Sequence, residues 1–302
     1  MDCLAHFDPL LLAGQVASGV ATGSVYALVA LGLVLIYKTS HVVNFAQGDL
    51  LLLGAYAGWA LASLGLPFPI VLAITLLLAA ASGALTERLL LRRMVGQPTI
   101  AVIIVTLGLS SMLRGLVFFF AGTEVRRFPE DSLPNIPVST GALVLPSVYV
   151  WSLLVVSAAV IGLTLFFRFS RHGIALRATA DDQQAAMSMG IRLSSAFALS
   201  WGLSVSVAAT AGILLANLTG VNFTLADLGL LVFPVVILGG LDSIPGAIVG
   251  GLVIGLLQNV ASGYLDPCAG GGLKTVFPFV VLVTILLIKP HGLFGRVQIE
   301  RV

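Results

Sequence analysis

Charged residues are scarce in this sequence. Only 9% of the 302 residues are Asp, Glu, Lys or Arg, whereas 58% are hydrophobic and the mean hydropathy is +1.09. A soluble domain carries about 25% charged residues because polar groups must cover its core. The few charges sum to +2 and are scattered, so the chain lacks the extended basic face that nucleic acid would need. The composition excludes a water-soluble domain of this size and nucleic acid as a partner, and it indicates membrane lipid as the main solvent.

The sequence also has little that could support chemistry. Its two cysteines, Cys3 and Cys268, stand in no CxxC or Cys/His cluster, so we expect no metal site. The nearest approach to a phosphate loop is GGGLKT at 270–275, where Leu273 takes the place of the glycine that must precede the lysine. No hydrophilic domain interrupts the chain to hold an ATPase. We therefore expect no catalytic residues and no cofactor in this chain, and we expect that it is not an enzyme.

Hydrophobic segments follow one another along almost the whole sequence. About 20 apolar residues are needed to cross a bilayer, and nine segments approach this length: 10–37, 42–64, 67–91, 98–121, 146–168, 193–217, 226–241, 244–264 and 273–289. The segments 226–241 and 244–264 are broken by Pro and Gly, and they fit either two spans or one re-entrant segment. The prediction is an all-α polytopic transmembrane bundle of about 8–10 helices, with residues 1–302 forming a single domain. The first 14 residues have no basic region ahead of the apolar run, so we expect the first helix to stay in the mature protein.

Basic residues in the connections predict the orientation, because Lys and Arg favour the cytoplasmic side. The run TERLLLRRMVG places Arg88, Arg92 and Arg93 inside. Alternation from there puts eleven of the fifteen basic residues inside, the other eight being Lys38, Arg168, Arg171, Arg177, Arg192, Lys289, Arg296 and Arg301. The N-terminus is then outside and the C-terminus cytoplasmic. The polar, proline-containing segment 122–145 becomes an exterior loop, which we expect to be irregular.

The longest hydrophilic stretch on the predicted inside is residues 168–193. Thr179 followed by Asp182 is an N-cap pattern, Asp181 and Asp182 favour the positive end of a helix, and Gly190 suits its C-terminal end. These signals predict a cytosolic helix of about three turns. Asp182, Ala186 and Gly190 are four apart and would share one narrow face. From spacing alone this stretch is either a solvated connector or a docking surface.

Polar side chains also occur within hydrophobic segments, where they are costly unless they face protein or water. In HVVNFAQGD, Asn44, Gln47 and Asp49 open an otherwise apolar segment, and Gly48 would permit a break in the backbone. This segment either borders a translocation path or caps a helix near the cytosolic interface. Arg114, within GLSSMLRGLVFFF, has either a structural role or a role in a pore.

Two weaker patterns concern the arrangement of the helices. Gly-xxx-Gly pairs begin at Gly19, Gly246 and Gly251, a spacing that lets helix backbones approach closely. The order Asn, Phe, Asp at residues 44, 45 and 49 returns at residues 222, 223 and 227, on segments predicted to run in opposite directions. This echo predicts an inverted repeat.

Four stretches together resemble one known family. Residues 168–193 resemble the cytoplasmic coupling loop of ABC importer permeases, in particular the branched-chain amino-acid permeases. The same family is resembled by GVATGSVYALVALGLVLIYKTSHVVNFAQGDLLLLGAY at 19–56, VILGGLDSIPGAIVGGLVIG at 236–255 and KPHGLFGR at 289–296. Their order and separations also fit, so the resemblance covers nearly the whole chain. One departure is Asp242, which stands where the family often has a small residue.

The resemblance implies a permease subunit in a bacterial inner membrane, forming half of a path for branched-chain or related small amino acids. It implies a second identical or homologous permease, two cytosolic ATPase subunits that bind ATP and Mg²⁺, and an external substrate-binding protein. Asp181, Asp182, Ala186 and Gly190 would then couple the permease to an ATPase. Permeases of the same family for urea or short amides remain open, as does an ion-gradient-driven secondary transporter, which would need ionisable groups near the midplane. A channel is a third option, but no repeated filter sequence is present.

Overall fold

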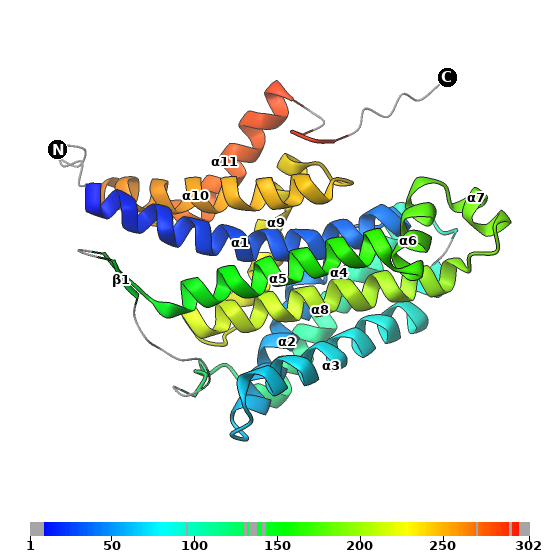
Figure 1. Ribbon diagram of the computed structural model, residues 1–302, viewed down its shortest axis with the longest axis horizontal. Helices are drawn as coiled ribbons and strands as arrows, with labels where there is room; N and C mark the ends of the chain where they lie inside the picture. Colours follow the sequence, from blue (N-terminus) through cyan, green and yellow to red (C-terminus); the bar gives the residue numbers. More distant parts are fainter. Residues whose placement is uncertain are drawn as a thin grey trace.

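The computed structural model describes residues 9–94, 96–129, 132, 138–140, 143–269, 271–289 and 292–295, and the arrangement is a bundle of α-helices (Figure 1). In chain order the helices are α1 Pro9–Ser40, α2 Gln47–Ala62, α3 Phe68–Leu89, α4 Thr99–Ala121, α5 Ser147–Phe169, α6 Arg171–Asp181, α7 Gln183–Ser188, α8 Leu193–Thr219, α9 Thr224–Gly239, α10 Ile244–Ala269 and α11 Leu273–Ile288. A short 3-10 helix, η1 Leu91–Met94, follows α3.

Each of the nine predicted hydrophobic segments contains a helix, but the helices differ in length. Within the described ranges, α1, α3, α4, α5, α8 and α10 are long and apolar enough to cross a membrane. The helices α2, α9 and α11 have 16 residues each. At 1.5 Å per residue they are about 24 Å long, less than the roughly 30 Å of a bilayer core. The helix in the predicted segment 42–64 is shorter than the segment, because residues 41–46 are not helical and α2 starts at Gln47.

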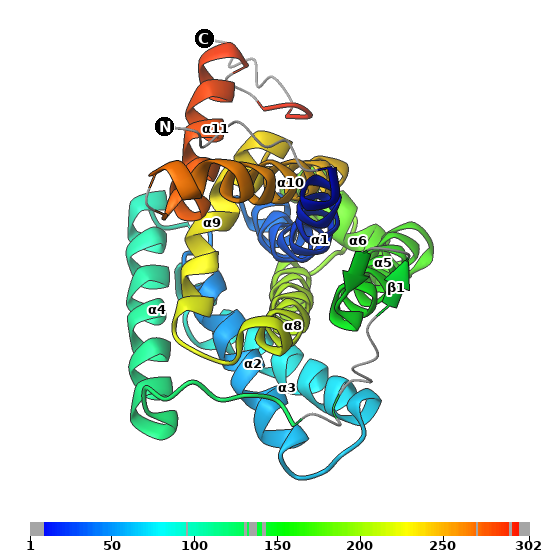
Figure 2. The same cartoon turned by 90° about the vertical axis from the view of Figure 1, so that its left-hand side faces the viewer.

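Long helices run along the molecule, and two short ones run across it. The helices α1, α5, α8 and α10 follow the long axis, while α2 and α9 cross it (Figures 1 and 2). The most deeply buried long helices are α1 and α8, which contact each other at the centre of the bundle. Their small and apolar side chains let neighbouring helices surround them on several sides.

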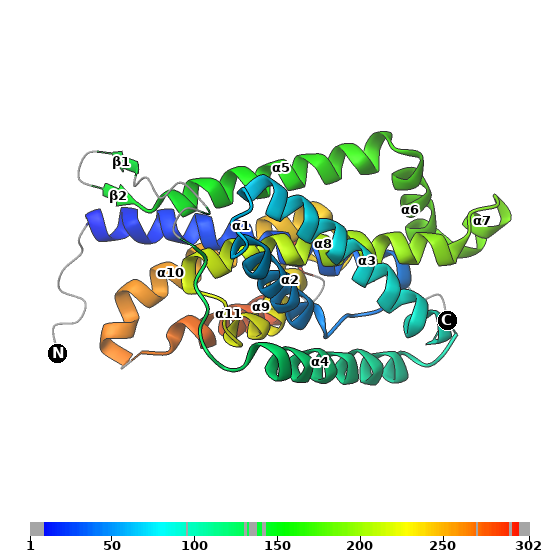
Figure 3. The same ribbon diagram turned by 90° about the horizontal axis from the view of Figure 1, so that it is seen from below.

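The two ends of the bundle differ in charge and in local structure. At one end lie α6 and α7, together with the ends of α1, α3 and α5, whose last turns contain Lys38, Arg88 and Arg168 (Figure 3). We call this the basic end. At the other end two antiparallel strands, β1 Val138–Thr140 and β2 Leu143–Leu145, form a small hairpin. The expectation that residues 122–145 are wholly irregular is therefore wrong.

The helices form two similar sets, α1–α4 and α8–α11. In each set a long buried helix is followed by a short non-helical segment and then by a 16-residue helix. The packing partners are exchanged between the sets: α1 packs chiefly on α10, α8 packs chiefly on α3, and the two short helices α2 and α9 contact each other. This exchange is what an internal repeat produces, and it agrees with the echo in the sequence.

Glycines allow the closest of these helix contacts. A Cβ atom at Gly255 of α10 would lie 2.2 Å from the Cα atom of Gly23 in α1, closer than any real contact. One at Gly246 would lie 2.0 Å from the carbonyl oxygen of Gly239 in α9. The packing role predicted for the Gly-xxx-Gly pairs is confirmed at these positions.

The C-terminal motif at 289–296 caps α9, as far as it is described. The backbone N–H of Leu293 donates to the carbonyl of Leu238 at 2.7 Å, and that of Phe294 donates to the carbonyl of Gly239 at 3.2 Å. These bonds satisfy carbonyls that the end of a helix leaves without partners. Pro290, His291 and Arg296 of the motif lie outside the described residues.

Candidate functional site

The non-helical segment between α1 and α2 is held by side chains inside the protein. Asn44 is fully buried, and its Oδ1 accepts a bond from the backbone N–H of Ala46 at 3.0 Å. Its Nδ2 donates to Oε1 of Gln47 at 3.1 Å, and the backbone N–H of Phe45 donates to Oγ1 of Thr106 at 3.4 Å. The backbone can leave the helical conformation here because these polar groups replace the missing helical bonds.

Gln47 is buried just as deeply. Its Oε1 also accepts from Oγ of Ser204 in α8 at 3.3 Å, and a Cβ atom at Gly32 of α1 would lie 2.6 Å from its Nε2. That Nε2 has no hydrogen-bond partner among the described residues. Asn44 and Gln47 therefore pack between helices, where protein groups surround their polar atoms.

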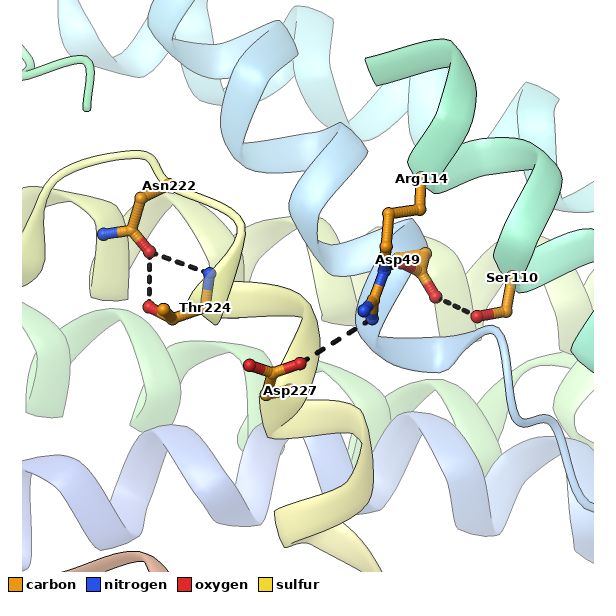
Figure 4. Close-up of polar contacts among 6 residues, drawn as sticks. All are labelled: Asp49, Ser110, Arg114, Asn222, Thr224 and Asp227. Atoms are coloured by element: carbon orange, nitrogen blue, oxygen red, sulfur yellow. Dashed lines mark hydrogen bonds and ion pairs between the residues drawn. The ribbon is translucent and has the colours of Figure 1, made fainter. Parts of the chain in front are cut away.

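Three charged side chains meet where α2, α4 and α9 come together (Figure 4). Oδ1 of Asp49 accepts from Nε of Arg114 at 3.0 Å, and the second carboxylate oxygen of Asp49 accepts from Oγ of Ser110. Nη2 of Arg114 lies 3.7 Å from Oδ1 of Asp227. We call Asp49, Arg114 and Asp227 the three-charge cluster. Its formal charge is −1, because one guanidinium serves two carboxylates.

The members of the three-charge cluster are unequally covered. The side chain of Asp49 is 2% exposed, that of Arg114 is 46% exposed and that of Asp227 is 61% exposed. Arg114 precedes the last residue of α4, Ala121, by seven positions, which is about 10 Å along the helix. Charges at this depth are costly in lipid. The face formed by α2, α4 and α9 must therefore be covered by protein or by water.

The repeated order Asn, Phe, Asp places residues at equivalent positions before and within α2 and α9. Asn222 accepts a bond from the backbone N–H of Thr224, two residues ahead, at 3.0 Å, just as Asn44 does from Ala46 (Figure 4). Asp49 and Asp227 both lie in the first turn of their short helices. The two halves of the molecule thus bring matching carboxylates to the same arginine.

Gly48 allows α2 and α9 to cross in contact. A Cβ atom at Gly48 would lie 2.0 Å from the carbonyl oxygen of Ala226 and 2.8 Å from the backbone nitrogen of Gly229. Gly48 itself is inside α2, so the expectation that it provides the backbone break is wrong. The break lies at residues 41–46, and the role of Gly48 is close packing.

The hydrophilic stretch 168–193 forms two helices rather than one. Asp182 separates α6 from α7, and its Oδ1 accepts from the backbone N–H groups of Gln184 at 2.8 Å and Ala185 at 3.0 Å. The N-cap is therefore Asp182 and not Thr179, which is buried within α6. Gly190 has φ +83° and ends the helix as predicted. The expected length was wrong, since α7 has six residues rather than three turns.

The surface that α7 presents also differs from the expected one. Ala186 is only 3% exposed and packs against its own chain, so it does not share an open face with Asp182 and Gly190. Asp181, Asp182 and Gly190 are exposed, and Met189 is 83% exposed. The exposed surface of this hairpin is therefore partly acidic and partly apolar, with Ala186 serving as its internal anchor.

One contact ties the α6–α7 hairpin to the centre of the bundle. Nε2 of Gln183 donates to the carbonyl of Thr39, near the end of α1, at 2.9 Å. Oγ1 of Thr39 donates to Oγ of Ser200 in α8 at 2.9 Å. The first residue of α7 is thus connected to both central helices.

The sequence identified some of these residues and missed others. Polar or small residues that interrupt apolar segments are visible in the sequence, and they identified Asn44, Gln47, Gly48, Asp49 and Arg114. The repeated Asn, Phe, Asp order alone indicated Asp227. Ser110, Ser204, Thr39 and Gln183 were missed. A single hydroxyl or amide is common in the helices of membrane proteins and carries no spacing signal, so only the fold identifies its partner.

The comparisons with known proteins cover almost the whole chain. A family model described as the permease component of branched-chain amino acid transport systems matches residues 15–286. The permease protein LivH of the high-affinity branched-chain amino acid transport system of Salmonella typhimurium is 31% identical over 307 residues, covering 95% of this chain and 97% of LivH. BraD of Pseudomonas aeruginosa is 31% identical with the same coverage. A probable LivH of Methanocaldococcus jannaschii is 30% identical and covers 89% of this chain and 88% of its own.

Among solved structures, PsaBC from Streptococcus pneumoniae in complex with Fab aligns over 95% of this chain and 92% of its own, with 16% sequence identity and a TM-score of 0.46. The family model and the sequence relatives establish the family without this structural match. The family model spans far more than half of the chain, and the relatives reach 31% identity over 95% of it. The chain belongs to the family of permease components of branched-chain amino acid transport systems.

Proposed function

We propose that this chain forms half of the translocation path of an ABC importer for branched-chain or related small amino acids in a bacterial inner membrane. The observation that carries the proposal is the three-charge cluster, in which Arg114 and Asp227 are half exposed on a face otherwise made of apolar helices. Family membership supplies the class of transporter and of solute. The cluster suggests where the path runs, because such charges require a watery or protein-covered surface.

The path would run along the face of α2, α4 and α9, closed by a second identical or homologous permease. Arg114 and Asp227 would border it, and buried Asp49 would hold the guanidinium in place. Asn44 and Gln47 would support the adjoining non-helical segment, and Gly48 of the crossing helix would keep α2 and α9 in contact. Side chains fixed in this way can offer charge to a zwitterionic solute at little cost in reorganisation.

Energy would come from two ATPase subunits, which bind ATP and Mg²⁺ and dock at the basic end. Asp181, Asp182 and Gly190 are the docking residues that we propose on the α6–α7 hairpin, and buried Ala186 would anchor this surface to the bundle. The bond from Gln183 to the carbonyl of Thr39 would transmit movement of the hairpin to α1. An external substrate-binding protein would deliver the solute at the opposite end. The N-terminus would be outside and the C-terminus cytoplasmic, as the basic residues favour.

A substitution in the hairpin tests the coupling role. Gly190→Arg places a long charged side chain on the exposed surface at a residue with φ +83°. In proteoliposomes containing the complete transporter, we expect this variant to lose most ATP-driven uptake. Gly190→Asn is the matched control, because Asn tolerates positive φ and adds little bulk. Normal uptake by Gly190→Arg, in a complex that assembles normally, would exclude the proposed docking surface.

The energy source and the solute have separate tests. Uptake that requires ATP inside the vesicles and persists when ion gradients are dissipated supports the proposal, whereas uptake driven by an ion gradient alone contradicts it. The solute class is tested on the cognate binding protein, whose melting temperature should rise with its true ligand. A rise with urea or short amides and none with leucine, isoleucine or valine would contradict the proposed solute.

A further inference from the structure

An apolar groove lies at the basic end on the opposite side of the bundle from α4. It has a volume of about 290 Å³ and is bounded by α1, α5, α6 and the start of α10. Leu31, Leu35, Leu163 and Ile244 form part of its wall. The one hydroxyl group among its lining residues, that of Thr164, already donates to a backbone carbonyl within α5 at 2.7 Å. The wall therefore offers an apolar surface with its polar groups satisfied.

Two arginines complete the lining of the groove. Arg168 lies in the last turn of α5 and Arg177 in α6, and both side chains are exposed. The guanidinium of Arg168 lies 5.5 Å from the ring centroid of Phe169. Within the described part of the chain, no carboxylate forms an ion pair with either arginine, and no acidic residue lines the groove. The groove thus combines an apolar wall with uncompensated positive charge.

The position of the groove favours contact with lipid. In two perpendicular views α5 and α4 lie on opposite sides of the bundle, so the groove is remote from the three-charge cluster (Figures 2 and 3). Leu35 is five residues from the end of α1, and Arg168 is one residue from the end of α5. The groove therefore opens near the level at which a bilayer passes from acyl chains to headgroups. Long basic side chains at such a level extend towards the interface.

We propose that this groove is a binding site for an anionic phospholipid of the membrane leaflet at the basic end. One acyl chain lies against Leu31, Leu35 and Leu163, and the headgroup phosphate binds Arg168 and Arg177. Apolar surface and positive charge occur together here, and an anionic lipid satisfies both, whereas free phosphate would leave the apolar wall unused. Basic pockets between membrane helices on the cytoplasmic side are suited to such headgroups. The bound lipid would connect α5 to α6, the helix that leads into the α6–α7 hairpin.

The test uses the full-length permease in its assembled transporter, purified in detergent with phosphatidylglycerol or phosphatidylcholine of the same acyl chains. Native mass spectrometry counts the retained lipids. We expect wild type to retain phosphatidylglycerol about 30-fold more strongly, since each basic residue near an anionic lipid contributes about fivefold. Arg168→Gln/Arg177→Gln should abolish this preference. Arg171→Gln, which changes an exposed arginine of α6 outside the groove, should preserve it.

A second variant tests the apolar part of the site. Leu163→Trp fills the groove and leaves both arginines in place, so it should weaken retention of phosphatidylglycerol even though the charge is unchanged. Each variant must elute as an intact complex with a wild-type melting temperature in lipid-free detergent. Equal retention of the two lipids by wild type would overturn the proposal, as would an unchanged preference in the double variant. Displacement of the lipid by millimolar inorganic phosphate would show that the site binds phosphate alone, and would also overturn it.

Discussion

The three-charge cluster makes a quantitative prediction about stability. Arg114→Gln removes the only cation of the described residues that contacts Asp49, whose side chain is 2% exposed, and leaves that carboxylate with Oγ of Ser110 as its hydrogen-bond donor. Breaking a buried ion pair from one side costs about 3–5 kcal/mol. The guanidinium is 46% exposed, which weakens its attraction and reduces the expected cost to about 2–3 kcal/mol.

The reverse substitution should cost less. Asp49→Asn keeps the shape of the side chain, and Arg114 retains Asp227 and its contact with solvent. We expect a cost of about 1 kcal/mol, the value of a hydrogen bond to a charged group less what the amide recovers. In the double variant no buried charge is left unpaired. Its cost should therefore be about 2 kcal/mol, so that the coupling energy between the two positions is about 1–2 kcal/mol.

The assay is equilibrium unfolding of the purified permease in mixed micelles with a rising fraction of SDS, followed through the intrinsic fluorescence of its three tryptophans. Wild type, the two single variants and the double variant together form a double-mutant cycle. Ser110→Ala is a useful fourth comparison, because it removes the other partner of Asp49 without changing the charge. If Arg114→Gln costs less than about 0.5 kcal/mol, or if the two single costs simply add, the carboxylate is not held by this arginine and the reasoning is refuted.

Two further predictions concern coupling and packing. Gln183→Ala removes the bond to the carbonyl of Thr39, so ATP hydrolysis should persist while the uptake per ATP hydrolysed falls severalfold. The control is Gln184→Ala, which changes an exposed neighbour. If the uptake per ATP in proteoliposomes is unchanged in Gln183→Ala, the proposed connection between the hairpin and α1 is contradicted. Gly48→Ala forces a Cβ atom to within 2.0 Å of a carbonyl oxygen in α9 and should cost about 1–3 kcal/mol or more in SDS unfolding. Gly108→Ala, with open space around it, should be neutral or stabilising by about 0.5–1 kcal/mol, and equal effects of the two substitutions would exclude tight packing at Gly48.

The hydrophobic pattern determined which segments are helices, and the spacing of glycines predicted where helices pack closely. Apolar runs predict membrane helices because an unpaired peptide group in lipid is so costly that nearly every such run must be helical. The same pattern could not give the length of α2, since residues 42–46 are also largely apolar. Their conformation depends on Asn44, Gln47 and Thr106, which supply hydrogen bonds only after distant segments have come together.

Local signals gave the end of the hairpin but not the surface it presents. Gly190 was predictable because positive φ favours glycine. The position of Ala186 was not, because helical spacing relates residues to one another and cannot say which face the bundle covers. The N-cap of α7 could not be predicted for the same reason. Thr179 and Asp182 both have side chains that can cap a helix, and tertiary packing placed Thr179 inside α6.

The sequence by itself determined a membrane-embedded, all-α chain with polar residues in apolar segments, because the energetics of lipid act on each residue separately. Only the tertiary structure decided that Asp49 and Asp227, 178 positions apart, share Arg114. It also decided that Gly48 serves the crossing of α2 and α9, and that Arg168 and Arg177 flank one groove. Each of these findings concerns residues that the fold places near one another. The energy of each residue depends on which partner the fold brings within a few ångströms, and a single sequence does not give the distance between them.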